Sequence, residues 1–293
     1  MDTSVYIANR ELRVISGRAA GKTIEVKDYA HVTLPEGAVI NGVVTDEREF
    51  TKAFKYVMEK NRRIAYKNIS LTLGSTQIYV KKAVVPEMSD KHLSEWMKDE
   101  LSDIGTEKDL VYDYTVLDAS GKTGTTVLLC AAKRELISGY IELFSQLGVS
   151  ISCIDTARNS LIKLLRIMKP GDTYIALAFD GNSLEAALFI DGIFCVANKT
   201  RLLEQRGTAE SFAEVDRMAS SLIQFNSAER SGRNISSILL MGDVKEAEAL
   251  GANLNQTFGL ESHIVTDDKK LVKAPADFDI AAYCYAAGNL VRV

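Results

Sequence analysis

Residues 174–193 read YIALAFDGNSLEAALFIDGI, two apolar runs separated by Asp180, Gly181 and Asn182. Two apolar runs joined by an Asp-Gly-Asn turn predict a hairpin of two buried strands. In several large enzyme families a loop of this composition holds the phosphates of ATP, because glycine lets backbone N–H groups come close and an Asp can orient a hydrated Mg²⁺. The nature of this turn therefore distinguishes two functions: an enzyme that binds ATP, or a scaffold that works by binding other proteins.

Strands and helices alternate on both sides of this hairpin, which predicts an α/β protein. The first half opens with paired strands at 4–8 and 12–16, and apolar periodicity restarts near residues 76 and 149. A separate module is therefore expected between those two points. The helices expected from apolar spacing and capping residues are 46–63, 89–103, 133–147, 155–168, 208–230, 243–258 and 277–290.

Length and composition indicate a folded protein without a membrane span. A chain of 293 residues, 46% hydrophobic and 25% charged, is long enough for two domains. The net charge of −4, with Lys and Arg distributed along the chain, predicts no direct binding to nucleic acid or to anionic lipid, and no apolar run is long enough for insertion into a membrane. The charged start and the four isolated cysteines predict a cytoplasmic protein with core thiols and no metal site.

Four stretches carry a resemblance to a known family. They are LPEGAVINGVVTDEREFTKAFK (34–55), KKAVVPEMSDKHLSEWMKDEL (81–101), VYDYTVLD (111–118) and LLCAAKRELISGYIELFSQLGVSISCID (128–155). In order and separation they resemble PilM-type type IV pilus assembly proteins, which belong to the FtsA-like part of the actin-like superfamily. The similarity runs through about residues 1–195 and weakens to pattern afterwards.

The resemblance implies an actin-like, ribonuclease H-like fold of two α/β halves. A β-α-β-β-α subdomain at 76–149 would be inserted into the first half. Residues 1–75 and 150–170 would form the first core subdomain, and residues 171–293 the second half. The last helix of the insertion is expected to bury four side chains against the insertion's own sheet, namely Leu136, Tyr140, Leu143 and Phe144.

Active members of this fold place an Asp-x-Gly hairpin in each half. In the first hairpin the same register puts Tyr6 at the Asp, Ala8 at the Gly and Arg13 at the family's Lys. In the second hairpin it puts Ala178 at the Asp and Asp180 at the Gly. The resemblance therefore implies degenerate phosphate loops.

Two further positions bear on nucleotide binding. Leu184 or Glu185 stands at the usual Thr, and Gly242-Asp243 keeps one Gly of the pair that approaches adenosine. A slip of one or two residues would instead make Asp180 the metal acid, with Gly181 behind it, and ATP with Mg²⁺ stays open as that alternative. Otherwise no cofactor and no catalysis are expected, and the chain is expected to be a pseudo-ATPase.

What remains is a function by contact. The resemblance implies a cytoplasmic scaffold, peripheral to the inner membrane, that works together with other pilus platform proteins. It would bind the N-terminal cytoplasmic peptide of a bitopic PilN-type protein, in a groove beside residues 76–87. The side chains expected to face that groove are Tyr79, Lys81, Ala83 and Val85. Val80 and Val84 are expected to point the other way.

Two other functions are kept open. One is an actin-like ATPase that polymerises or switches with nucleotide. The other is the cytoplasmic component of a type II secretion or DNA-uptake platform, which shares the architecture.

Overall fold

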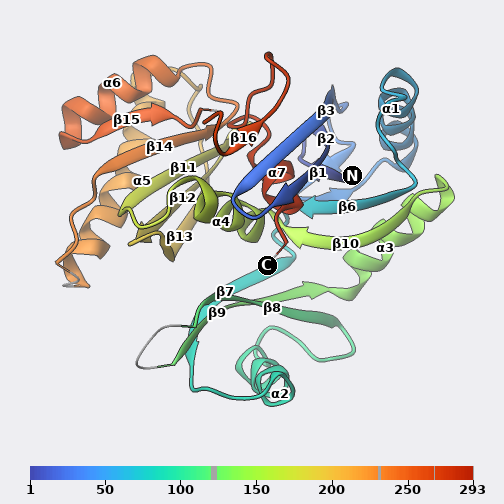
Figure 1. Cartoon of the computed structure of the whole chain (residues 1–293), viewed down its shortest axis with the longest axis horizontal. Helices are drawn as coiled ribbons and strands as arrows, with labels where there is room; N and C mark the ends of the chain where they lie inside the picture. The colour runs from blue at the N-terminus through green and yellow to red at the C-terminus, as the bar shows by residue number, and fades with distance from the viewer. Residues whose placement is uncertain (120–123, 230–231, 267, 293) are drawn as a thin grey trace. The chain divides into compact units, whose positions relative to one another are not determined.

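A computed structural model describes residues 1–119, 124–229, 232–266 and 268–292 (Figure 1). These residues divide into two compact units. The first unit comprises Met1–Leu164, Val272–Ala276 and Tyr285–Val293, and the second comprises Leu165–Leu271 and Asp277–Cys284. The strands are β1 (Asp2–Ile7), β2 (Glu11–Ala20), β3 (Thr23–Thr33), β4 (Val39–Ile40), β5 (Val43–Val44), β6 (Asn68–Leu73), β7 (Ile78–Val85), β8 (Leu110–Asp118), β9 (Thr125–Lys133), β10 (Ser150–Thr156), β11 (Tyr174–Asp180), β12 (Ser183–Ile190), β13 (Ile193–Arg201), β14 (Ser237–Gly242), β15 (Glu261–Ile264) and β16 (Val272–Lys273). The helices are α1 (Glu47–Lys60), α2 (Asp90–Glu100), α3 (Arg134–Gln146), α4 (Ala157–Met168), α5 (Ala209–Ala228), α6 (Ala247–Phe258) and α7 (Cys284–Leu290).

Each unit is built on one large sheet, and the two sheets share a strand order. In the first unit the order is β10-β6-β1-β2-β3-β16, with β1, β2 and β3 antiparallel and β6 and β10 parallel to β1. In the second unit the order is β13-β12-β11-β14-β15, again an antiparallel meander followed by two parallel strands. The opening hairpin of each half is therefore present as expected, and β13 extends the second one into a meander.

Helix α1 forms where the sequence predicts it. The Asp46 side chain accepts a hydrogen bond from the Glu49 backbone N–H at 3.0 Å, which satisfies a free donor of the first turn. Phe50, Phe54 and Val57 recur at helical spacing and are buried. They join the apolar residues of β1, β2 and β6 in one core cluster.

The inserted module differs from the expected one at its end. Strands β7, β9 and β8 form a separate three-stranded sheet, and α2 covers one face of it (Figure 1). The four buried side chains of α3, however, lie in the core cluster of the first unit and not in the cluster of this sheet. The Phe144 ring lies 5.0 Å from Phe54 and 6.0 Å from Phe50, and the Tyr140 hydroxyl donates to the Gly42 carbonyl at 2.9 Å.

The expectation that α3 packs on the insertion's own sheet is therefore wrong. The inserted module is β-α-β-β, and its compact part ends at β9. Periodicity showed correctly which face of α3 is apolar, but it carries no information on which of two sheets that face covers.

The C-terminal region also differs from expectation. Residues 277–283 are not helical, and the helix begins only at Cys284; the Asp279 carboxylate accepts hydrogen bonds from the Ala281 and Ala282 N–H groups in this segment. Most of α7 then lies in the first unit. The Asn289 amide donates to the Leu71 carbonyl at 2.9 Å, so the end of the chain is tied to β6 and does not belong with 171–293.

Candidate functional site

The first hairpin is closed by its own side chains. Tyr6 is buried, and its ring centroid lies 4.6 Å from that of Tyr285. Ala8 is also buried, and its N–H donates to the Glu11 carbonyl at 2.9 Å within the turn. Arg13, opposite Tyr6 in the sheet, is paired with the Glu11 carboxylate through Nε at 2.7 Å. At these positions the hairpin offers neither a carboxylate for a metal nor an unpaired cation for a phosphate.

The second hairpin has a tight turn. Asp180 ends β11 and pairs in register with Ser183, which leaves Gly181 and Asn182 as the two turn residues. Gly181 has φ of +56°, and a glycine at the first of two turn positions is typical of a hairpin turn. Ala178 is buried opposite Glu185. The turn is a regular hairpin turn between buried strands.

An arginine that the sequence analysis missed occupies the end of this hairpin. The Arg206 Nη1 donates to the Gly181 carbonyl at 2.9 Å, and its guanidinium carbon lies 4.8 Å from the centroid of the Phe179 ring. Its Nε and Nη2 both lie 2.7 Å from Oε1 of Glu246. Only 16% of the Arg206 side chain and 15% of the Glu246 side chain are exposed, so this ion pair is largely removed from water.

A cavity of about 430 Å³ lies beside this ion pair, lined by Gly181, Asn182, Arg206, Asp243, Lys245 and Glu246. The guanidinium is neutralised by Glu246, and Lys245 stands 4.0 Å from the Asp243 carboxylate. Close packing within the protein requires a glycine at position 242. A Cβ on Gly242 would lie 1.9 Å from the Phe179 carbonyl oxygen. The cavity's charges are balanced internally, which disfavours a polyphosphate.

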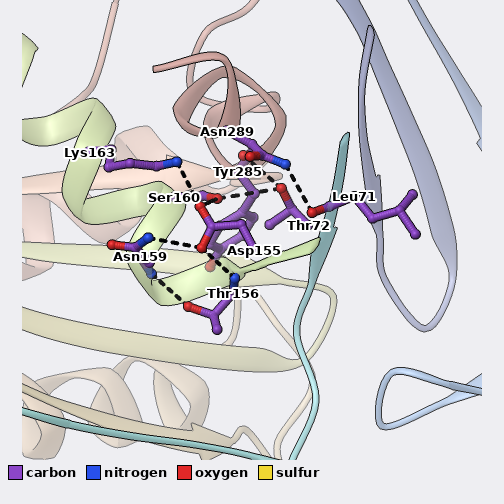
Figure 2. A network of polar contacts seen from close by, with 9 residues as sticks. All are labelled: Leu71, Thr72, Asp155, Thr156, Asn159, Ser160, Lys163, Tyr285 and Asn289. Carbon is purple, nitrogen blue, oxygen red and sulfur yellow. Dashed lines mark hydrogen bonds and ion pairs between the residues drawn. The ribbon is translucent and has the colours of Figure 1, made fainter. Parts of the chain in front are cut away.

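A third polar cluster lies in the first unit at the carboxyl ends of the parallel strands β6 and β10 (Figure 2). Asp155 is held there by Lys163 Nζ at 2.7 Å and by the Asn159 side-chain amide at 2.9 Å. The Ser160 hydroxyl and the Thr156 N–H also donate to it, at 3.3 and 2.7 Å. The carboxylate is ion-paired and accepts from several donors, as in a structural ion pair.

The same cluster holds the last helix in place. The Thr72 hydroxyl lies 3.4 Å from the Ser160 hydroxyl and donates to the Tyr285 carbonyl at 3.5 Å (Figure 2). Gly288 packs against the backbone of Ser160 so closely that a Cβ would lie 1.8 Å from the carbonyl oxygen. Small and hydroxyl-bearing residues on this face of the sheet let α4 and α7 approach.

Each unit, taken by itself, is therefore a poor fit for Mg²⁺-nucleotide. The first hairpin has a tyrosine where the fold's active members have the metal-orienting acid. The second hairpin's carbonyl is taken by Arg206, and the nearby cations are paired with carboxylates. Among the described residues no group of three or more His, Cys, Asp or Glu is arranged to hold a metal.

Two of the four cysteines have raised thiol pKa values. Burial, with the nearby carboxylates of Asp113 and Asp155, raises the pKa of Cys130 to about 12, and burial raises the pKa of Cys153 as well. Both thiols stay protonated near neutral pH. Cys284 is buried, whereas Cys130, Cys153 and Cys195 are half-buried, so three of the four are less enclosed than expected.

The candidate peptide strand β7 is an edge strand. In the order β7-β9-β8 it pairs with β9 on one side only, and no described strand pairs with its other side. An unpaired strand edge presents backbone N–H and C=O groups to which an extended peptide can add.

The faces of β7 are the reverse of those expected. Val85 is 1% exposed and packs with Leu93 and Met97 in the cluster beneath α2, and Ala83 packs against the same cluster. Lys81, on this face, is ion-paired with Glu100, and the hydrogen bond between them raises the Lys81 pKa. Tyr79 is exposed near the other end of the strand.

Val84, expected to point away from the groove, is 53% exposed on the opposite face. Val80 and Lys82 lie on that same face and are half-buried. The assignment of Ala83 and Val85 to an open groove is therefore wrong, because alternation fixes two faces but not which of them the module's helix covers.

Comparison with known proteins gives the class of fold first. No protein-family model matches the chain, and no curated protein is similar to it in sequence. A protein of Bacteroides thetaiotaomicron described as having an actin-like ATPase fold and unknown function superposes with a TM-score of 0.50 at 13% identity, covering 97% of this chain and 94% of its own. The two units and their shared strand order are those of the actin-like fold, as the sequence predicts.

Within that class two further structures each cover 99% of this chain. A chain of the structure described as the PilM-PilN type IV pilus biogenesis complex superposes with a TM-score of 0.82 at 16% identity, covering 99% of this chain and 97% of its own. The cytoplasmic domain of EpsL, an inner-membrane component of the type II secretion system of Vibrio cholerae, gives 0.52 at 7% identity, covering 99% and 95%. The resemblance to PilM-type proteins is thus confirmed at the level of the fold.

None of the described helices has both the length and the apolar character needed to cross a membrane.

Proposed function

We propose that this chain is a cytoplasmic scaffold of a type IV pilus assembly platform. In this role it binds the N-terminal cytoplasmic peptide of a PilN-type inner-membrane protein and does not hydrolyse ATP. The observation that carries the proposal is the fold likeness to a chain of the PilM-PilN complex, which covers 99% of this chain and so includes the inserted module.

The free edge of β7 supports a peptide-binding role. A peptide that adds to this edge gains main-chain hydrogen bonds, and the exposed Val84 beside the edge offers an apolar contact. Because main-chain hydrogen bonds and apolar contacts depend little on salt, affinity is expected to change little with ionic strength.

The absence of hydrolysis is supported by the two hairpins. Tyr6 and Ala8 replace the residues that would orient Mg²⁺ and approach phosphate. The Arg206–Glu246 ion pair occupies the end of the second hairpin. Phosphoryl transfer depends on positioned charges around the transferred group, and both hairpins would have to supply them.

The test is a titration of the isotope-labelled full chain with a synthetic peptide matching the N-terminal cytoplasmic segment of a PilN-type protein from the same organism. Chemical-shift changes are expected along β7 and β9. The variant Val84→Asp is expected to weaken binding about tenfold without affecting folding, because the side chain is already exposed.

Leu203→Asp is the matched control, because Leu203 is an 83% exposed apolar residue of the second unit. It is expected to leave the affinity unchanged. Shifts confined to residues 171–271, or equal affinity of the Val84→Asp variant, would refute the assignment to β7. A charged residue at Ala83 is a poorer probe, since it would disturb the module's core first.

A second function has one observation in its favour. The likeness to the EpsL cytoplasmic domain, at a TM-score of 0.52, supports a role in a type II secretion or DNA-uptake platform. Identification of the membrane protein that co-purifies with the chain from its own cell distinguishes the two roles.

A further inference from the structure

Helix α1 and the turn after it carry a concentration of positive charge. Residues 47–67 hold seven Lys and Arg against three carboxylates, whereas the remainder of the chain holds 28 Lys and Arg against 36 carboxylates. All seven cations are exposed. This basic face consists of Arg48, Lys52, Lys55, Lys60, Arg62, Arg63 and Lys67.

Most of these charges make no ion pair with the part of the chain that the structure describes. Lys52 lies 3.8 Å from the Glu49 carboxylate, and Lys60 Nζ lies 5.7 Å from the centroid of the Tyr56 ring. Among the described residues, the other five cations make no ion pair. Their charge is therefore available to an external anion.

The stability of the helix explains only part of the arrangement: Glu47 and Glu49 in the first turn suit the positive end of the helix dipole. Lys60, in the last turn, suits the negative end of the helix dipole, but Arg48 lies in the first turn, where a positive charge is unfavourable. Arg48 and Lys52 are also like charges four residues apart, which destabilises a helix by a few tenths of a kcal/mol.

The basic face is displayed on a rigid element. The opposite side of α1 is fixed in the core by Phe50, Phe54 and Val57, and Figure 1 shows α1 at the outer edge of its unit. Tyr56 is 53% exposed among the cations. An exposed tyrosine beside Lys and Arg is the combination found where proteins meet the headgroup region of a membrane.

We propose that the basic face of α1 docks on an anionic phospholipid surface, without insertion of the chain. A surface of phosphate headgroups attracts each Lys or Arg near it and needs no shaped pocket. The excess of carboxylates in the remainder of the chain makes residues 47–67 opposite in sign to the average charge of the protein.

The same distribution disfavours a nucleic acid as the occupant. The remainder of the chain is acidic in sum and so adds no further attraction for a long polyanion. A lipid surface meets only the side that faces it. The choice of a lipid also rests on the proposed function, which places the chain beside the inner membrane.

The experiment is co-sedimentation of the full chain with vesicles, with no partner peptide present. Vesicles of phosphatidylglycerol and phosphatidylcholine are expected to bind the protein at low salt, and vesicles of phosphatidylcholine alone are not. Binding is expected to be lost at 0.5 M salt, where charge attraction is screened within about 4 Å. The double variant Arg62→Gln/Arg63→Gln is expected to lower the partition coefficient about ten- to thirtyfold.

The matched control is Lys269→Gln/Lys270→Gln, which removes the same charge from two adjacent exposed residues of the second unit. It is expected to bind like the unmodified chain. Equal loss in both double variants, or equal binding to neutral vesicles, would overturn the proposal. Preferential binding of duplex DNA that depends on Arg62 and Arg63 would overturn it in favour of a nucleic acid. Because no peptide is present, failure here leaves the test at β7 unaffected.

Discussion

Removal of the Arg206 side chain tests whether the end of the second hairpin is a structural ion pair. In Arg206→Ala the Glu246 carboxylate, 15% exposed, loses its cation, and the Gly181 carbonyl loses a donor at 2.9 Å. Breaking a fully buried ion pair on one side costs about 3–5 kcal/mol. Because both side chains retain some contact with water, we expect about 2–3 kcal/mol for this variant.

Hydrogen exchange is the suitable assay, because a chain of two units need not unfold in one step. The slowest-exchanging amides of β11 and β12 are expected to exchange about 30- to 150-fold faster in the variant, which is the same free energy expressed as a ratio. Arg201→Ala is the control, since Arg201 is an exposed arginine of the neighbouring strand β13 and is expected to change exchange less than about twofold.

A double variant separates the ion pair from simple loss of packing. Arg206→Met with Glu246→Leu replaces both charges by apolar groups of similar size and is expected to be more stable than Arg206→Ala alone. The reasoning is refuted if Arg206→Ala leaves exchange of the β11 and β12 amides unchanged. It is equally refuted if the double variant is destabilised by the sum of the two single changes.

Three further predictions follow from the described contacts. The purified chain is expected to show no Mg²⁺-dependent ATP turnover above a buffer blank and no melting shift with millimolar ATP. The double variant Tyr6→Asp/Ala8→Gly is expected not to create turnover, because the second hairpin is altered too. An ordered nucleotide with Mg²⁺ in a crystal would contradict this. Gly288→Ala is expected to lower the free energy of unfolding by about 2 kcal/mol in a denaturant titration, because its Cβ would lie 1.8 Å from a backbone oxygen. Gly139→Ala, in an exposed helix position with open space, is the control and is expected to raise the free energy of unfolding by about 0.5 kcal/mol. Equal effects of the two changes would refute the close packing of α7. Thermal stability is expected to fall as pH rises from about 9 toward 12. Burial raises the pKa of Cys130 to about 12, so the thiol of the unfolded chain loses its proton at a lower pH than the thiol of the folded chain does. A melting temperature that stays constant over that pH range would contradict this prediction.

The net charge of the chain does not show how the charges are distributed over its surface. A net charge of −4 with dispersed cations predicts no contact with anionic lipid. The burial of Phe50, Phe54 and Val57 turns the polar side of α1 outward, so its four cations are exposed, and the three cations of residues 61–67, next along the chain, are exposed as well. The expectation of no membrane insertion is unchanged by this, because charge attraction requires contact with headgroups only.

The sequence by itself determined the opening hairpin of each half and most of the order of elements. These features depend on local spacing, turn residues and identity, all of which can be read along one segment. The tertiary structure alone decided that α3 covers the core sheet, that Ala83 and Val85 face α2, and that Arg206 reaches Gly181. Each of these is a contact between segments distant along the chain, and periodicity specifies that a face is apolar without specifying what packs against it.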